Sequence, residues 1–408
     1  MSEQQSRYAY VTLLTRPSYL AGAIILAYSL HKHSPSTPLI IIYTPSTLGP
    51  PAIRALESES PHTNLILRPV SPLSPAPAEN SHDKSGSVAE RFTDTWTKLC
   101  VFTLTDTPFS HLCFLDADTL ILRNPSPTVF SVEVQEKLSA SSTLLMATHI
   151  CVCNLDGDAW APDCWTPQNC AFTRLTRGSG PAAVDASHAT LGAFNSGVMV
   201  FAPSTTLAAL VMDTFASTPA DVLSAMQFPD QDFLNMVLRG RWGSLGWEVN
   251  ALKTWRYWHG NVWEDGEVRV LHYIVDKPWA RRVDGEGRAG YKGWDGVTHG
   301  WWWGVYEEWR REREGEGDGE VVRVVERWVD GGEGEAELGA VGGKAQDWAR
   351  RWEDVGEKNE QDGEKHEDGT YGQGPHGPVL RKPMLGERGH GAVVREHALK
   401  GPGKCEMD

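Results

Sequence analysis

The sequence lacks a long apolar run and an excess of positive charge. Its longest apolar stretch, residues 20–30, is too short to span a bilayer, and the opening MSEQQSRYAY lacks the basic and then apolar pattern of a signal peptide. The 408 residues contain 38 lysines and arginines against 53 aspartates and glutamates, and the net charge of −15 argues against nucleic-acid binding. We therefore expect a cytoplasmic protein with no transmembrane segment and no nucleic-acid partner.

Cysteine is scarce, with seven residues in the whole chain. An odd number without a secretory signal is typical of reduced thiols. Four cysteines lie close together in CVCNLDGDAWAPDCWTPQNC, at Cys151, Cys153, Cys164 and Cys170. We expect free thiols there. A disulfide and a zinc site are the alternatives, although Cys-x-Cys is not the Cys-x-x-Cys spacing usual for zinc.

Strand and helix patterns alternate in the first part of the chain. Residues 8–14 form a buried-strand pattern, residues 19–33 have apolar residues at helical spacing, and residues 39–43 (LIIIY) are uniformly apolar and β-branched. Later strands are predicted at residues 111–115, 194–201 and 268–274. This order predicts an α/β fold with a mainly parallel sheet.

The composition changes after about residue 310. Residues 311–408 hold 20 of the 40 glycines and 23 acids against 15 lysines and arginines, and long apolar runs disappear. We therefore predict one folded domain over residues 8–310 and a largely disordered acidic tail over residues 311–408, with a helix allowed near residues 321–329.

Two acids stand out in HLCFLDADTLILRNP. Asp116 and Asp118 follow an apolar strand, and a buried carboxylate must be paired or bound to a metal. Side chains at i and i+2 of a strand point to the same side, so both could bind one hard cation such as Mn²⁺ or Mg²⁺. The alternative is a turn in which Asp118 bonds its own backbone.

One other chemistry uses a similar motif. Phosphatases of the haloacid-dehalogenase type also end an apolar strand in Asp-x-Asp. They place Thr or Val where this chain has Leu120, and they need a downstream Gly-Asp-x-x-x-Asp that the chain does not complete. We therefore favour the metal site.

Four further segments accompany the acids: YVTLLTRPSYLAGAIILAYSL, TDTWTKLCVF, AFNSGVMVF, and PDQDFLN followed by VLHYIVDKPW. In order and spacing the chain resembles glycosyltransferase family 8, the glycogenin and galactinol-synthase group, over roughly residues 8–310. The resemblance implies a GT-A fold, a single nucleotide-binding α/β domain with a mixed sheet. It also implies a UDP-sugar donor, Mn²⁺ with Mg²⁺ as the alternative, and retention at the anomeric carbon.

The resemblance also assigns roles to residues. The metal ligands would be Asp116, Asp118 and His272, and Lys277 would contact the diphosphate. The catalytic residues would be Asp230, Gln231 and Lys98. The donor would be bound by Leu13, Thr15, Tyr19, Asn195, Ser196, Gly197 and Lys277. Arg91 is a weaker candidate for a site residue, because its spacing to Lys98 differs from that in glycogenin. Asp232 is expected to cap a helix.

The chain departs from glycogenin at two places. Val275 stands where glycogenin has a glycine near the phosphates, and Ser187 falls where glycogenin has an acid before Asn-Ser-Gly. The resemblance therefore does not assign the contacts to the donor sugar, and the sequence does not name the sugar.

Aromatic residues bear on the acceptor. Tyr257 is the one tyrosine between Gln231 and His272, and it lies among tryptophans, so we expect it to pack in an aromatic cluster. The tryptophans of residues 294–309 are expected to pack the last helix, with a sugar-stacking surface as the alternative.

The residues and the resemblance together predict an enzyme that moves a hexose, glucose or galactose, from a UDP-sugar to a hydroxyl of a small molecule or glycan. The alternatives are an inactive nucleotide-sugar-binding scaffold and a self-glucosylating glycogenin. The sequence is also compatible with a homodimer.

Overall fold

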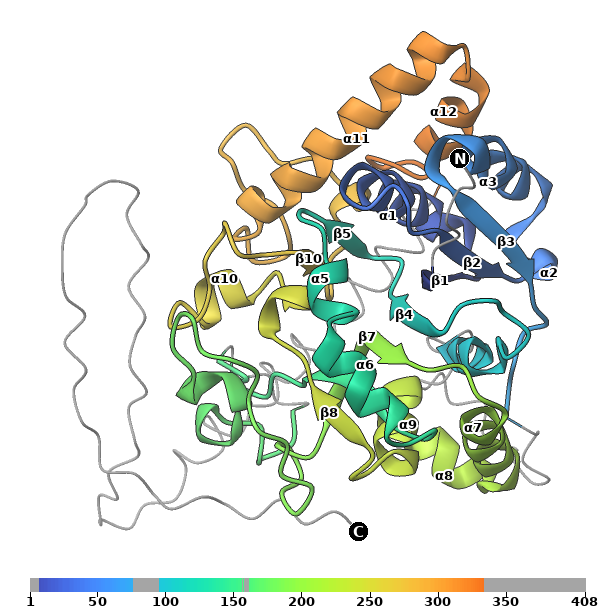
Figure 1. The fold of residues 1–408 in the computed structure, drawn as a ribbon. Helices are drawn as coiled ribbons and strands as arrows, with labels where there is room; N and C mark the ends of the chain where they lie inside the picture. Colours follow the sequence, from blue (N-terminus) through green and yellow to red (C-terminus); the bar gives the residue numbers. More distant parts are fainter. Residues whose placement is uncertain (1–6, 76–94, 156, 158–160, 334–408) are drawn as a thin grey trace, which may run out of the picture.

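The computed structural model describes residues 7–75, 95–155, 157 and 161–333. A seven-stranded sheet in the order β3-β2-β1-β4-β7-β6-β8 forms its centre (Figure 1). All strands run parallel except β7, which is antiparallel to both β4 and β6. The prediction of a mixed, mainly parallel sheet is confirmed. The strands of this sheet are β1 (Tyr8–Leu14), β2 (Leu39–Tyr43), β3 (Leu65–Pro69), β4 (His111–Leu115), β6 (Leu145–His149), β7 (Phe194–Phe201) and β8 (Trp242–Ser244).

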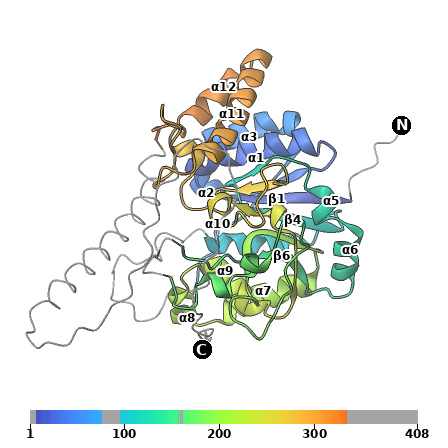
Figure 2. The ribbon, with the colours of Figure 1, turned by 90° about the vertical axis from the view of Figure 1, so that its left-hand side faces the viewer.

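Helices cover both faces of the sheet (Figure 2). Helices α1, α3, α11 and α12 lie on one side, and α7, α8 and α9 lie on the other. The helices of the described residues are α1 (Leu20–His33), α2 (Pro45–Leu48), α3 (Pro50–Thr63), α5 (Ser126–Val129), α6 (Val132–Ser139), α7 (Thr205–Ser217), α8 (Ala220–Ala225), α9 (Pro229–Val237), α10 (Trp255–Trp258), α11 (Gly296–Glu316) and α12 (Gly319–Glu326). The segment TWTKLCVFT, within the motif TDTWTKLCVF and the residue after it, is a 3₁₀ helix, η2 (Thr95–Thr103).

The alternation of side chains along each strand produces two cores. On β1, Tyr10 and Leu14 pack with α1, whereas Ala9 and Val11 pack with the core that contains α7 and α9. Since both faces are covered, β1, β2 and β4 are almost entirely apolar rather than alternating with polar residues. This explains why continuous apolar runs identified the strands correctly.

A second sheet brings distant segments together beside the acids. It consists of β5 (Thr119–Ile121), β10 (Val270–His272) and β9 (Ala251–Leu252), with β10 in the middle. Strand β10 is antiparallel to β5, and His272 pairs with Thr119. This register places the end of β10 next to the residue that follows Asp118. The strand predicted over residues 268–274 is therefore present but shorter.

The folded region extends past residue 310, where the sequence analysis ended the domain. The guanidinium of Arg313 on α11 donates to both carboxylate oxygens of Glu59 on α3, at 2.9 and 2.7 Å, and both residues are buried. Val321 and Val325 on α12 are also buried, in agreement with the helix allowed there. The boundary at residue 310 is therefore too early, and the remainder of the predicted tail, residues 334–408, lies outside the described residues.

Three of the four tryptophans of α11 pack inward, and Trp301 is half-buried. Trp302, Trp303 and Trp309 are buried, as expected for residues that attach the last helix, whereas Trp294 is 53% exposed. Among the described residues, α11 and the other helices do not reach the length and apolar character that a bilayer crossing requires.

The buried pair of Glu59 and Arg313 yields a test of this packing. Replacing Arg313 with Leu removes the charged partner of a buried carboxylate, although Trp309 still donates to it, and should lower the free energy of unfolding by about 3–5 kcal/mol. Urea unfolding followed by circular dichroism measures the loss. The double variant Glu59→Leu/Arg313→Leu is the control and should be more stable than Arg313→Leu. A single variant as stable as the wild type would show that α11 does not depend on this pair.

Candidate active site

The two acids lie in a turn rather than in the strand itself. Strand β4 ends at Leu115, and the amide of Thr119 donates to the carbonyl of Asp116 at 3.1 Å to close the turn into β5. The expected strand alternation is therefore not what brings the carboxylates together. The turn does so, and it lies at the carboxyl end of β4, where parallel sheets bind ligands.

His272 faces both acids. Its Nε2 lies 3.4 Å from Asp118 Oδ1 and 3.9 Å from Asp116 Oδ2. Its Nδ1 lies 2.9 Å from the amide oxygen of Asn250, and an amide oxygen only accepts, so Nδ1 carries the proton. The bond fixes the tautomer and leaves Nε2 as a lone-pair donor toward the acids, which is the arrangement of metal-binding histidines.

Gly197 makes room for this ring. A Cβ atom at this position would lie 2.3 Å from His272 Cε1, so any larger residue would displace the histidine. The carbonyl of Gly197 also accepts from the amide of Asp116 at 2.9 Å, which ties β7 to the turn. The glycine of Asn-Ser-Gly therefore sets the geometry of the three candidate ligands.

Lys98 joins the turn to α9. Its Nζ lies 2.9 Å from Asp116 Oδ1 and 2.6 Å from Asp230 Oδ2. Burial disfavours the charge of Lys98, but the two carboxylates outweigh burial and raise its pKa above the usual range. Burial is the main cause that raises the pKa of Asp116. The lysine therefore remains charged and neutralises two acids that would otherwise repel each other.

Lys277 pairs with Asp118 as Lys98 pairs with Asp116 and Asp230. It donates to Asp118 Oδ2 and, at 2.8 Å, to the carbonyl of Tyr273. Burial acts to raise the pKa of Asp118, but opposing contacts, of which the charge of Lys277 is the largest, lower it below the usual range. Asp118 is therefore ionised at neutral pH and able to bind a cation.

The Asn-Ser-Gly and Asp-Gln motifs contact each other. Ser196 Oγ donates to Asp230 Oδ2 at 2.9 Å, and the side-chain amide of Asn195 donates to Gln231 Oε1 at 3.1 Å. Asn195 Oδ1 accepts from Asn250 at 2.9 Å. The amide of Asn195 is thus held by protein groups, and its contact with a donor sugar stays a prediction.

The predicted nucleotide residues lie at the carboxyl end of β1. Leu13 and Thr15 are half-buried there, and Tyr19 follows at the start of α1. The ring of Tyr19 meets Trp279 edge to face at a centroid distance of 5.5 Å, and Lys277 Nζ lies 5.8 Å from the Tyr19 centroid. Tyr19 therefore adjoins the candidate metal site from the β1 side, which fits its predicted role beside the base.

The structure shows the surroundings of the two residues that depart from glycogenin, Val275 and Ser187. Val275 has φ 63°, a left-handed conformation that favours glycine, so the chain keeps a glycine-like backbone with a β-branched residue. Ser187 bonds the exposed Asp185 at 2.6 Å and is not part of the acidic centre. Asp232 accepts from the amide of Phe228 at 2.8 Å, which agrees with its expected capping role.

Three further positions complete the comparison with the sequence. Arg91 lies outside the described residues. Tyr257 meets Trp258 and Trp294 edge to face, at centroid distances of 6.1 and 5.2 Å, as expected for an aromatic cluster. Asn250 was missed, because an asparagine before an apolar pair has no distinctive spacing, although it is fully buried and holds both His272 and Asn195.

Comparison with known proteins identifies relatives of the whole domain. The profile described as glycosyl transferase family 8 matches residues 10–282. Galactinol synthase 1 of Solanum lycopersicum is 24% identical over 279 residues, covering 68% of this chain and 75% of the relative. Glycogenin of Neurospora crassa is 22% identical over 330 residues, covering 79% of this chain and 38% of the relative.

The same comparison with solved structures finds a galactosyltransferase, LgtC, in complex with donor and acceptor sugar analogues. The likeness has a TM-score of 0.46 and 17% identity, and it covers 72% of this chain and 95% of the other.

The geometry around Asp118 generates the first functional test. In Asp118→Asn the side chain loses its charge but keeps an oxygen that can accept from Lys277, so the fold should be retained. We expect Mn²⁺-dependent binding of UDP to weaken by at least about 100-fold, as loss of a direct ligand should exceed the effect of outer-shell changes. Calorimetric titration of UDP with and without Mn²⁺ measures this. Asp185→Asn, an exposed acid outside the site, is the control. Wild-type UDP affinity in Asp118→Asn would remove Asp118 from the metal site.

Proposed function

The chain belongs to glycosyltransferase family 8, and we propose that it is a retaining, metal-dependent transferase that moves glucose or galactose from a UDP-sugar to a hydroxyl acceptor. Its mixed, mainly parallel sheet with helices on both faces is the GT-A fold. The observation that carries the proposal is the convergence of Asp116, Asp118 and His272 between two buried lysines.

The candidate ligands suit a hard divalent cation. One ligand atom from each of the three residues lies within 4.8 Å of the others, and two carboxylates with one imidazole are reasonable for Mn²⁺. When bound, such a cation neutralises the diphosphate and acts as a Lewis acid on the leaving group. Asn250 supports this use of His272, because it fixes the proton on Nδ1 and so keeps Nε2 available.

The lysines account for the charge of the donor. Asp116, Asp118 and Asp230 face Lys98 and Lys277, so the cluster has a net charge of −1 while His272 is neutral. A divalent cation would make this net charge positive, which suits an anionic diphosphate. Lys277 is the residue that we assign to the phosphates, as a point charge that stabilises departing UDP.

Asp230 and Gln231 form the sugar side of the proposed site. Both contacts of Asp230, from Lys98 and Ser196, fall on Oδ2. We infer that this carboxylate stabilises the positive charge that develops at the anomeric carbon in a retaining displacement. Gln231 would orient the same region through Asn195 and Ser196, which both donate to its Oε1.

The scaffold alternative conflicts with the cost of the site. Two buried acids, the half-buried Asp116 and two buried lysines are costly to desolvate. A scaffold that binds neither a metal nor a donor would gain nothing from this arrangement. Self-glucosylation has one specific candidate, Tyr257, whose ring packs between Trp258 and Trp294. We therefore favour a separate acceptor, either a small molecule or a glycan.

Turnover tests the proposed activity. Purified full-length protein is incubated with UDP-glucose, UDP-galactose and other UDP-sugars, with and without Mn²⁺, and released UDP is measured. We expect release from at least one UDP-hexose that depends on the metal. UDP binding without release from any donor would support the scaffold instead.

Substitution of Asp230 tests its proposed catalytic role in the same assay. Asp230→Ala should lower kcat by about 100-fold or more with UDP affinity retained, because its interaction strengthens only in the transition state. The neighbouring capping variant Asp232→Asn is the matched control and should keep the wild-type kcat. Unchanged kcat in Asp230→Ala would transfer the role to Asp232 or to the donor phosphate.

Intact-mass spectra test the choice of acceptor. After incubation with Mn²⁺ and UDP-glucose or UDP-galactose, the protein should keep its mass, because the ring packing of Tyr257 disfavours an exposed acceptor geometry. A ladder of added hexoses that disappears in Tyr257→Phe would contradict this and identify a self-glucosylating enzyme.

A further inference from the structure

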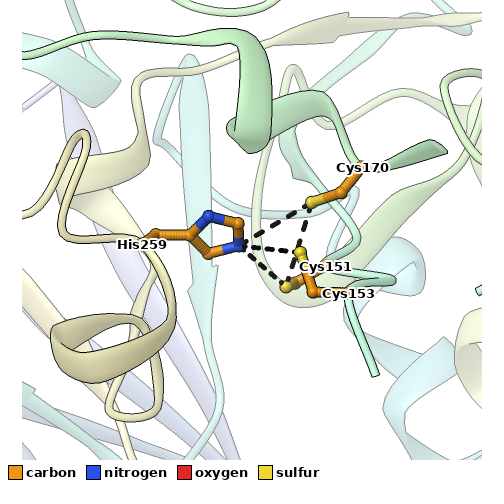
Figure 3. Close-up of side chains that lie close together, drawn as sticks. All are labelled: Cys151, Cys153, Cys170 and His259. Atoms are coloured by element: carbon orange, nitrogen blue, oxygen red, sulfur yellow. Dashed lines mark hydrogen bonds between the residues drawn. The ribbon is translucent and has the colours of Figure 1, made fainter. Parts of the chain in front are cut away.

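Four side chains away from the catalytic cluster converge on one point (Figure 3). The Sγ atoms of Cys151, Cys153 and Cys170 lie 3.2, 3.4 and 3.7 Å from Nε2 of His259. Cys151 and Cys170 are 4.0 Å apart at sulfur. Among the described residues, this group and the Asp116 cluster are the two sets of three or more metal-ligand side chains that come this close.

The spacing matches a tetrahedral zinc site. With Zn–S distances of about 2.3 Å and a Zn–N distance of about 2.0 Å, tetrahedral geometry holds two sulfurs about 3.8 Å apart and each sulfur about 3.5 Å from the nitrogen. The observed S···N distances lie on either side of that value, and the S···S distance of 4.0 Å is close to it. Four atoms of the right elements thus surround a space of the right size.

The surrounding residues hold the imidazole in place. The ring of His259 packs against Phe172 and Trp255 at centroid distances of 5.8 and 5.7 Å, both edge to face. Asn261 donates to the carbonyls of Phe172 and Leu175, each at 2.8 Å, and so ties the chain after His259 to the chain after Cys170. These contacts keep Nε2 directed at the sulfurs.

We propose that Cys151, Cys153, Cys170 and His259 bind a structural Zn²⁺ ion. Three soft thiolates and an imidazole favour zinc over the hard cations expected at the carboxylate site. Because the protein supplies all four ligands, the site has no open position for a substrate, which makes it structural rather than catalytic. Binding releases the thiol protons to solvent and leaves the Cys₃His site with one net negative charge.

A disulfide explains the cluster less well. A bonded pair needs sulfurs about 2.05 Å apart, and Cys151 and Cys170 are 4.0 Å apart. Such a bond would also leave the third sulfur and His259 without a role. The sequence had grouped Cys164 with the other three, but Cys164 is not part of the converging set, and His259, 89 positions beyond Cys170, takes the fourth place.

The site would fasten three irregular segments to one another. Cys151 and Cys153 follow β6, Cys170 lies between two short 3₁₀ helices, and His259 follows α10. Long connections of this kind gain stability from a metal, because the ion replaces regular hydrogen bonding as their link.

Metal analysis of the full-length protein tests the proposal. Protein produced in zinc-supplemented medium and dialysed against EDTA should retain about one zinc per chain by plasma mass spectrometry, because a closed thiolate site holds the ion tightly. Co²⁺ exchanged into the site should give the intense visible bands of tetrahedral cobalt and a thiolate-to-metal charge-transfer band. An iron-containing protein, or metal-free protein with a Cys151–Cys170 disulfide by peptide mapping, would overturn the proposal.

Variants separate this site from the catalytic one. His259→Ala and Cys170→Ser should reduce zinc to less than about a tenth of an ion per chain, whereas His259→Cys, which keeps four ligands, should retain it. Cys100→Ser and Asp118→Asn are the controls, and both should keep full zinc. If a ligand variant fails to fold, zinc release from the wild type on titration of its thiols with a mercurial gives the same answer, with release complete only after three thiols have reacted. Full zinc in His259→Ala and Cys170→Ser, or zinc loss in Asp118→Asn, would contradict the assignment.

Discussion

Mutual repulsion of carboxylates at the carboxyl edge of the sheet is the constraint on which this structure depends. Asp116, Asp118 and Asp230 are brought to one place, and they stay there because Lys98 bridges two of them and Lys277 pairs with the third. Both lysines are buried, so water screens their charges only weakly. One negative charge remains uncompensated, and in the proposed function a divalent cation compensates it.

Three separate elements supply the acids and the histidine of this cluster, and the fold is what aligns them. The β4–β5 turn carries the paired acids, β10 carries His272 through its pairing with β5, and α9 begins beside β7 with Asp230. Gly197 lies so close to the imidazole of His272 that a side chain at position 197 would displace the ring. At the cysteine cluster, three irregular segments bring the candidate ligands together, and these segments are not strands of a sheet.

The sequence predicted those parts of the molecule whose signals are local. Buried parallel strands are continuous apolar runs, so β1, β2 and β4 were identified with their observed bounds. The GT-A fold and the family came instead from the resemblance of five motif segments to glycosyltransferase family 8. Three features depend on distant partners and were missed. The α11–α3 contact through Arg313 lies past a change in composition, Asn250 has no motif, and His259 joins the cysteines from another segment.

The central claim is that Asp116, Asp118 and His272 form one metal site next to the donor diphosphate. The most direct measurement is an anomalous difference map from crystals grown with Mn²⁺ and UDP. We expect one manganese peak bound to Asp116, Asp118 and His272 Nε2, with the diphosphate of UDP in contact with the same ion. UDP bound without a manganese peak at these three residues, or manganese bound elsewhere along UDP, would contradict the account.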